Sequence, residues 1–128
     1  MRPQHGFTLI ELLVVVLIVG LLAAIGVPKF ASSKERAFIA TMKADLRNLA
    51  SAEESYLYDK GAYFSGAIPD PAIQFEPSTA VSITLSGVTT SGWQAIAQHS
   101  QTAKTCAVFY GTASPIGGAV EEGIAACS

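Results

Sequence analysis

The sequence Phe7-Thr-Leu-Ile-Glu11, followed by an almost unbroken apolar run from Leu12 to Val27, determines how the rest of this chain is organised. Glu11 is the only charged residue between Phe7 and Val27. A helix of about 20 predominantly apolar residues spans the hydrocarbon core of a bilayer. Its apolar side chains outweigh the roughly 2.5 to 3.5 kcal/mol that one central acidic residue costs. We therefore predict that this stretch inserts as a membrane helix.

A carboxylate inside a membrane span requires a partner of opposite charge. No Lys or Arg lies within two helical turns of Glu11. Cleavage after Gly6 would place a new α-amino group on Phe7, about one turn from Glu11, and packed copies of the chain could pair these two groups. Buried ion pairs add little net stability, but an unmatched charge is costly. Glu11 is therefore a candidate for selecting the register between copies.

The sequence Gly6-Phe7-Thr8-Leu9-Ile10-Glu11, the apolar run and Pro28 at its end resemble the class III signal and N-terminal helix of type IV pilins and the related pseudopilins. The resemblance implies that a prepilin peptidase removes residues 1–6, cutting between Gly6 and Phe7, and that Phe7 is then N-methylated. It also implies that Phe7 and Glu11 guide the docking of subunits. The match is dense over residues 6–28.

The resemblance further implies a cellular location. The precursor would be stored in the inner membrane as a single-pass protein with its body in the periplasm, and the mature form would lie in an extracellular surface filament. Its partners would be other copies of the chain in a helical filament, the prepilin peptidase and the pilus assembly machinery of the inner membrane. Lys29, Lys34 and Arg36 follow the span, so the positive-inside rule does not decide the orientation.

Gly20, Gly26 and Pro28 interrupt the helical run. Each lowers helix stability, and Pro28 does so most, because proline lacks a backbone N–H and clashes with the preceding turn. One interpretation is a tolerated kink, as in many membrane helices. The other, which the pilin resemblance supports, is a stretch that loosens when the subunit leaves the membrane and enters a filament.

Beyond Pro28 the sequence predicts an amphipathic continuation of the same helix, up to about Lys60. Apolar residues recur at three- and four-residue spacing, which suits packing against a sheet, and Gly61 is a stop signal. The apolar stripe comprises Phe38, Met42, Leu46, Leu49, Ala52 or Glu53, and Tyr56, and the opposite face is expected to carry Lys34, Glu35, Lys43, Asp45, Arg47 and Glu54.

Strand and turn patterns dominate the rest of the chain. Residues 61–79 are rich in glycine and proline and are expected to form a loop that packs over the body, a candidate subunit interface by resemblance. Residues 81–86 alternate apolar and polar side chains, and residues 93–98 and 105–110 predict two more strands. Together they suggest an antiparallel meander lying on the second half of the helix.

The fold class expected from these segments is α+β, with the pilin fold that the resemblance implies. A long N-terminal helix, residues 7–60, has an apolar transmembrane half, residues 7–28, and an amphipathic second half. The second half would pack on a small antiparallel sheet of three to four strands in a globular head, residues 61–128. A head of this size has a marginal core and benefits from a covalent link.

Two cysteines, Cys106 and Cys127, supply the means for such a link and indicate an oxidising compartment. They can form one intramolecular disulfide, and two buried free thiols are the alternative. In pilins a C-terminal disulfide closes a surface loop. The resemblance implies that this loop spans residues 107–126 here and faces partners.

The remaining residues contain no pattern typical of catalysis. The net charge of −2 gives no broad basic surface for nucleic acid, and metal-spaced Cys/His clusters and glycine-rich phosphate loops are absent from the sequence. His99 lies in a Ser/Thr/Gln turn and is interpreted as a solvated polar residue, and Glu121 and Glu122 as a solvated pair. We therefore predict no enzymatic activity, no metal and no cofactor.

The resemblance implies a structural subunit of a type IV pilus that serves motility, adhesion or DNA uptake. A type II secretion pseudopilin is the first alternative. Major pseudopilins commonly carry an acidic calcium-binding loop near the C-terminus, whereas residues 100–128 contain only Glu121 and Glu122 as acidic side chains. A monomeric membrane-anchored or secreted binding protein is the second alternative, and cleavage after the apolar run would indicate an ordinary secretory signal.

Overall fold

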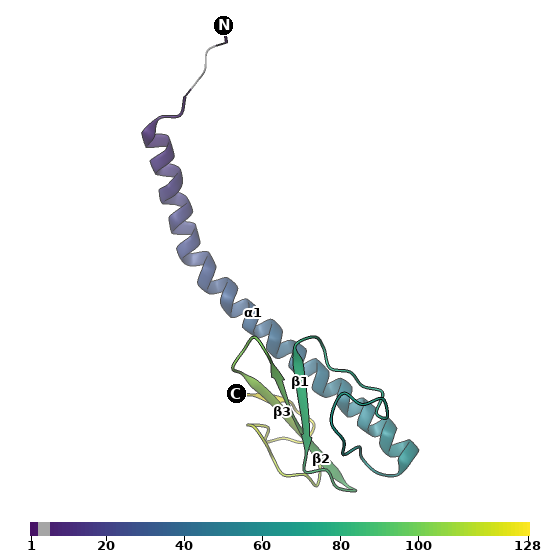
Figure 1. Ribbon diagram of the computed structural model, residues 1–128. Coiled ribbons are helices and arrows are strands. Elements are labelled where there is room, and N and C mark those ends of the chain that lie inside the picture. Colours follow the sequence, from purple (N-terminus) through teal and green to yellow (C-terminus); the bar gives the residue numbers. More distant parts are fainter. Residues whose placement is uncertain (3–5) are drawn as a thin grey trace. The chain divides into compact units, whose positions relative to one another are not determined.

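The structure is a computed structural model that describes residues 1–2 and 6–128, so residues 3–5 of the predicted leader lie outside the described residues. The described part contains one helix and four strands. They are α1 (Leu9–Lys60), β1 (Val81–Ser86), β2 (Gly92–His99), β3 (Thr105–Gly111) and β4 (Ala126–Cys127), of which Figure 1 labels α1, β1, β2 and β3. The predicted α+β class is confirmed. Contacts between residues divide the chain into two units, Met1–Lys34 and Glu35–Ser128.

The first unit contains the N-terminal part of α1, and its apolar side chains are exposed. Between Phe7 and Phe30 the exposed fraction of the large apolar side chains ranges from 45% at Val14 to 90% at Phe7, so the described residues leave this surface exposed. Among the described residues, α1 contains the one stretch that is long and apolar enough to cross a membrane. Pro28 lies inside α1, which is helical on both sides of it.

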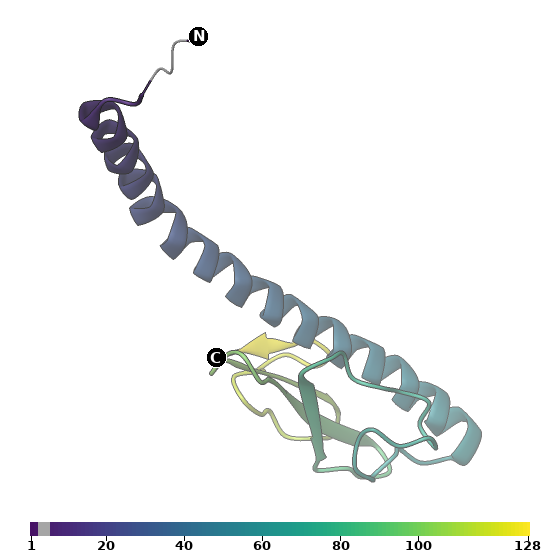
Figure 2. The same cartoon turned by 45° about the horizontal axis from the view of Figure 1, so that its top comes forward.

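The second unit is built from the C-terminal part of α1 and the sheet. Met42, Leu46 and Leu49 are fully buried, which confirms the predicted apolar stripe. They pack in one core cluster with residues of the sheet and of the segment between α1 and β1. Figure 2 shows the sheet and this segment lying along the C-terminal part of α1. The cluster also contains Phe64, Ile73 and Phe75 from that segment, Ile83 from β1, Trp93, Ala95 and Ala97 from β2, and Cys106 and Val108 from β3. The segment at residues 61–79 therefore packs on the body, as expected.

The four strands form one antiparallel sheet in the order β1-β2-β3-β4. A row of directly paired residues crosses the whole sheet: Ile83, Ala97, Cys106 and Cys127. Directly opposite residues of an antiparallel pair share a face of the sheet. Cys106 and Cys127 end this row and form a disulfide, which confirms the predicted bond.

The disulfide joins Cys106 to Cys127 and so encloses residues 107–126, but only part of this stretch is loop. β3 continues to Gly111 and β4 begins at Ala126, so the connection between strands covers residues 112–125. This connection folds over the sheet face opposite the main core. Ala119, with Ala113 and Ile116, packs there against Ala107 and Phe109 of β3. The C-terminal loop therefore provides part of the second apolar cluster.

The prediction that His99 is a solvated polar residue is wrong. His99 is buried, because it continues the β2 alternation of Trp93, Ala95 and Ala97, whose side chains face the main core. Its ring stacks on Phe38 of α1 with centroids 4.2 Å apart, and its Nδ1 accepts a hydrogen bond from the Gln101 backbone N–H. The His99 side chain therefore packs between the sheet and α1.

Candidate functional site

The first turn of α1 is organised by Thr8 and Glu11. The Thr8 backbone N–H and hydroxyl each donate to Oε2 of Glu11 at 2.8 Å, and the Glu11 backbone N–H donates to the Thr8 hydroxyl at 3.3 Å. Thr8 precedes the first helical residue, Leu9. This reciprocal arrangement is a capping box, in which the side chains satisfy free N–H groups at a helix start. Its signature, Thr-x-x-Glu before an apolar run, is readable in the sequence and was missed there.

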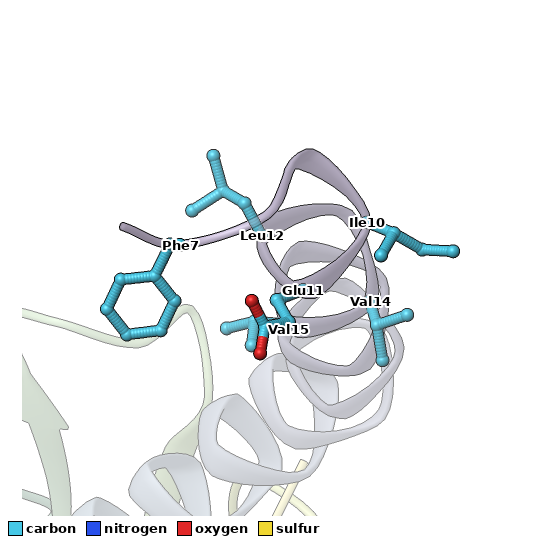
Figure 3. Close-up of a pocket in the computed structure, with 6 residues that line it drawn as sticks. All are labelled: Phe7, Ile10, Glu11, Leu12, Val14 and Val15. Atoms are coloured by element: carbon cyan, nitrogen blue, oxygen red, sulfur yellow. The ribbon is translucent and has the colours of Figure 1, made fainter. Parts of the chain in front are cut away.

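The side chains around Glu11 form an exposed apolar hollow. Figure 3 shows the Phe7 ring beside the start of the helix and the Glu11 carboxylate projecting from its side. Phe7 and Leu12 occupy the two positions of a hydrophobic staple, which fixes how a chain enters a helix. The hollow is lined by Phe7, Ile10, Glu11, Leu12, Val14 and Val15. Glu11 is thus the one polar group in an apolar surface, with its second oxygen, Oε1, outside the bonds to Thr8.

The other predicted sites of the first unit lie along the same segment. Gly6 and Phe7 precede α1, whereas Gly20, Gly26 and Pro28 lie inside it. A Cβ atom added at Gly20 or Gly26 would meet no atom within 4 Å. Neither glycine is therefore required by packing within this chain. The cleavage site, the methylation of Phe7 and the loosening of the helix stay predictions.

Two acidic residues, Asp45 and Glu53, lie on the core side of α1. Asp45, expected on the exposed face, is only 3% exposed. It lies three residues after Met42 and four before Leu49, so it shares their face. Its carboxylate accepts the backbone N–H of Ser78 at 2.8 Å and the Ser78 hydroxyl at 2.7 Å. Asp45 therefore holds the end of the segment at residues 61–79.

Glu53 holds the beginning of the same segment. Its side chain is 0% exposed, and Oε2 accepts the backbone N–H of Phe64 at 2.9 Å. Among the described residues, nothing donates to its other oxygen, Oε1. Next to it, the Tyr63 hydroxyl donates to Glu54 at 3.2 Å. Two carboxylates from one face of α1 thus anchor both ends of the loop. The sequence gives no signal for these contacts, because the partners are far apart along the chain.

Burial controls the electrostatics of Glu53. Removal from water disfavours the ionised form and raises the pKa of Glu53 to about 7. The Phe64 N–H opposes this rise, and the nearby charge of Glu54 adds to it. Burial also raises the pKa of Tyr63 and of Tyr110, with Glu54 and Glu122 contributing to both. The negative charges of Glu54 and Glu122 thus add to the effect of burial on the pKa of these two tyrosines.

The C-terminal loop also has an acidic anchor. Glu122, expected to be solvated, remains exposed, but its carboxylate accepts the backbone N–H of Gly111 at 2.6 Å. The bond links the loop to the end of β3, next to the turn where Gly111 has a φ of 63°. In the part of the chain that the structure describes, no group of three or more His, Cys, Asp or Glu side chains is placed to hold a metal ion.

Comparisons with known proteins find a family model and several relatives. A family model described as the prokaryotic N-terminal methylation motif matches residues 1–27. The type II secretion system core protein G of Pseudomonas aeruginosa is 45% identical over 62 residues, which cover 48% of this chain and 44% of that protein. The type IV major pilin protein PilA of Myxococcus xanthus is 43% identical over 60 residues, which cover 47% and 27%.

A third relative matches more of the chain. The type IV wide pilus major component PilA4 of Thermus thermophilus is 34% identical over 102 residues, which cover 78% of this chain and 77% of that protein. The chain thus spans less than half the length of the other two relatives and more than three quarters of this one. The similarity therefore extends beyond the apolar helix into the sheet.

Because the pKa of Glu53 is raised in the folded state, we predict that the second unit becomes less stable to unfolding as the pH rises. The folded state binds a proton with a pKa of about 7, against an ordinary value of 4.5, so between these values folding takes up a proton. The free energy of unfolding should therefore fall from pH 4.5 to 7, by on the order of 3 kcal/mol. Urea unfolding of the detergent-solubilised chain, followed by the fluorescence of the single, buried Trp93, measures this slope.

Glu53→Gln removes the titrating group and should abolish most of the slope. Glu76→Gln changes an exposed carboxylate of the same loop and should leave it intact. A slope of wild-type size in Glu53→Gln would show that another group is responsible.

Proposed function

Because this chain belongs to the type IV pilin-like family, we propose that it is a structural subunit that residues 7–28 hold in the inner membrane and that polymerises into a surface filament. The supporting observation is the apolar surface of the first unit, which the chain leaves exposed, with one carboxylate at its start. Lipid tails or the same segment of other copies would cover such a surface. The role is structural and involves no catalysis.

Processing would create the amine that Glu11 requires. In the proposal, a prepilin peptidase cuts between Gly6 and Phe7, and the new N-terminus of Phe7 is methylated but remains a cation. The methylation motif matched over residues 1–27 supports this step. Removal of residues 1–6 leaves Thr8 and the rest of the capping box in place.

The geometry of the first turn suggests how Glu11 selects register. Thr8 donates both hydrogen bonds to Oε2. Oε1 therefore remains free to accept a hydrogen bond from the Phe7 ammonium of a neighbouring copy. The capping box restricts the carboxylate to one orientation before it meets that partner, so less conformational entropy is lost on pairing. A copy packed in the wrong register would leave the carboxylate unmatched in an apolar core, which is strongly unfavourable.

The head would form the outer part of the filament. In this proposal residues 61–128 project from the helical core, with the loop at residues 61–79 in contact with neighbouring subunits and the disulfide-closed C-terminal loop facing outward. Asp45 and Glu53 support the first role, because they fix both ends of the loop to α1. Motility, adhesion and DNA uptake are all compatible with this arrangement.

A type II secretion pseudopilin is the alternative within the same architecture. The similarity to the core protein G of Pseudomonas aeruginosa favours it. The longer match to the pilus component of Thermus thermophilus favours the pilus. Residues 100–128 also offer few oxygen ligands for a calcium ion, since their acidic side chains are Glu121 and Glu122.

Two variants test whether assembly depends on the charge of Glu11 or on its part in the helix cap. Glu11→Gln keeps an amide oxygen that can accept the Thr8 N–H but removes the charge, so we expect normal membrane insertion and at least a tenfold loss of sheared filaments. Thr8→Ala weakens the cap by about 1 kcal/mol and keeps the charge, so filaments should persist. Mass spectrometry confirming a methylated Phe7 terminus in each variant is the control. Equal filament yields from Glu11→Gln and the wild type would refute the ion pair.

The proposed loosening at Gly20, Gly26 and Pro28 predicts a change in hydrogen exchange. Backbone amides in residues 20–28 should exchange faster in assembled filaments than in subunits held in lipid, because the helical hydrogen bonds open there. Residues 12–18 serve as the internal control and should be protected in both states. Equal protection of residues 20–28 in both states would mean that the glycines and proline only kink the helix.

The choice between the pilus and the secretion pseudopilin predicts where the filament lies. We expect an antibody against residues 61–128 to label long fibres outside intact cells. A strain that carries Glu11→Gln is the negative control. Labelling that appears only after the outer membrane is permeabilised would instead support the pseudopilin.

A further inference from the structure

Two lysines and a phenylalanine lie where the apolar run of the first unit ends. Between Phe7 and Lys34 the ionisable side chains are Glu11 at one end and Lys29 and Lys34 at the other. Phe30 is 66% exposed, and the Lys34 Nζ lies 5.1 Å from the centre of its ring. A cation over an aromatic face is attracted by the electrons of the ring. The end of the span is therefore marked by two cations, one of which lies over an exposed aromatic ring.

The spacing places this group at the boundary of a bilayer. At about 1.5 Å per residue, the rise along α1 from Glu11 to Lys29 is about 27 Å. The hydrocarbon core is about 30 Å thick. When Glu11 lies near one boundary, Lys29 and Phe30 therefore reach the other, and Lys34 lies about one turn beyond. Lysine side chains at such positions extend their ammonium groups to the level of the lipid headgroups.

These cations lie on the side of the membrane where the positive-inside rule disfavours them. Cytoplasmic flanks normally carry the excess of Lys and Arg, but in the proposed orientation this group faces the body of the chain. The hydroxyls of the neighbouring Ser32 and Ser33 are engaged within the helix, because both donate to the Lys29 carbonyl at 3.0 Å. Within residues 29–34 the two ammonium groups are thus the polar side-chain groups left for the headgroup layer, and the exposed Glu35 and Arg36 follow directly.

We propose that Lys29, Phe30 and Lys34 form a collar that binds the headgroups of anionic phospholipids in the leaflet facing the body of the chain. The inference rests on the proposed storage in the membrane. Charge complementarity selects this partner: an anionic phospholipid carries a net negative phosphodiester, whereas a zwitterionic lipid neutralises its phosphate with its own ammonium. Each lysine near an anionic surface contributes roughly fivefold in affinity. The collar would fix the depth of the stored subunit and retain it until it is drawn into a filament.

Spin-labelled lipids test the collar directly. The processed full-length chain is reconstituted into phosphatidylcholine vesicles that contain some phosphatidylglycerol, with a trace of spin-labelled phosphatidylglycerol or phosphatidylcholine. Electron paramagnetic resonance then gives the relative affinity of the two lipids for the protein surface. We expect at least a threefold preference for phosphatidylglycerol at low salt, and a weaker preference in high salt because ions screen the attraction.

Variants assign the preference to the collar. Lys29→Gln with Lys34→Gln should reduce the relative affinity to about one. The matched control, Lys60→Gln with Lys104→Gln, removes two exposed lysines of the second unit and should keep the wild-type value. Phe30→Leu keeps the apolar volume but removes the ring below Lys34, and should lower the preference less than the double lysine variant does.

The outcomes separate failure of the collar from failure of the proposed function. A chain that alkaline carbonate releases from the vesicles would overturn both membrane storage and the collar. A chain that resists carbonate but shows equal affinity for both lipids would overturn the collar alone. If the collar variant loses filaments while its lipid preference stays at the wild-type value, the two lysines serve contacts between copies, and the collar is again overturned.

Discussion

The apolar side chains between Phe7 and Val27 are exposed in this chain and must be covered by other molecules. At about 25 cal/mol per Å² of apolar surface, leaving them in water is strongly unfavourable. Lipid tails and neighbouring copies of the helix are similarly apolar, so the hydrophobic effect alone hardly distinguishes a stored subunit from an assembled one. The balance between the two states then depends on the few polar groups in the segment. This is why Glu11 at one end and Lys29 and Lys34 at the other have consequences out of proportion to their number.

Glu11 has two tasks that depend on separate oxygens. Oε2 closes the capping box with Thr8, which stabilises the first turn and orients the carboxylate. Oε1 then provides an acceptor for a cation from outside the chain. A carboxylate that is already ordered loses less side-chain freedom when it pairs, so the local cap and the proposed ion pair support each other. A capped helix start also explains how one acidic residue is accommodated in an apolar segment without a lysine or arginine nearby.

The head depends on polar groups that are buried and paired. Its core is small, and the loop at residues 61–79 supplies Phe64, Ile73 and Phe75 to it. Apolar contacts are not directional, whereas the bonds of Asp45 to Ser78 and of Glu53 to Phe64 require one position of each end of the loop. Asp45 has both oxygens bonded, but Glu53 has one oxygen without a donor among the described residues and a pKa raised to about 7 by burial. The contact of Glu53 with the beginning of the loop is therefore expected to respond to pH.

Hydropathy and local periodicity were enough to predict the helix and the three longer strands, because each depends on residues that are near in sequence. The disulfide was predicted on another basis, since the chain has only two cysteines and they can form one intramolecular bond. The same local reasoning misplaced Asp45 and His99. The chemistry of a polar side chain predicts that it is exposed. When the residue occupies an apolar position of a helical stripe or a strand alternation, however, its side chain faces the core. Whether it can stay there depends on a partner such as Ser78 or Phe38, which no local pattern identifies. When periodicity and side-chain chemistry disagree in this chain, periodicity gives the correct face, and the disagreement itself marks where a specific buried contact must exist.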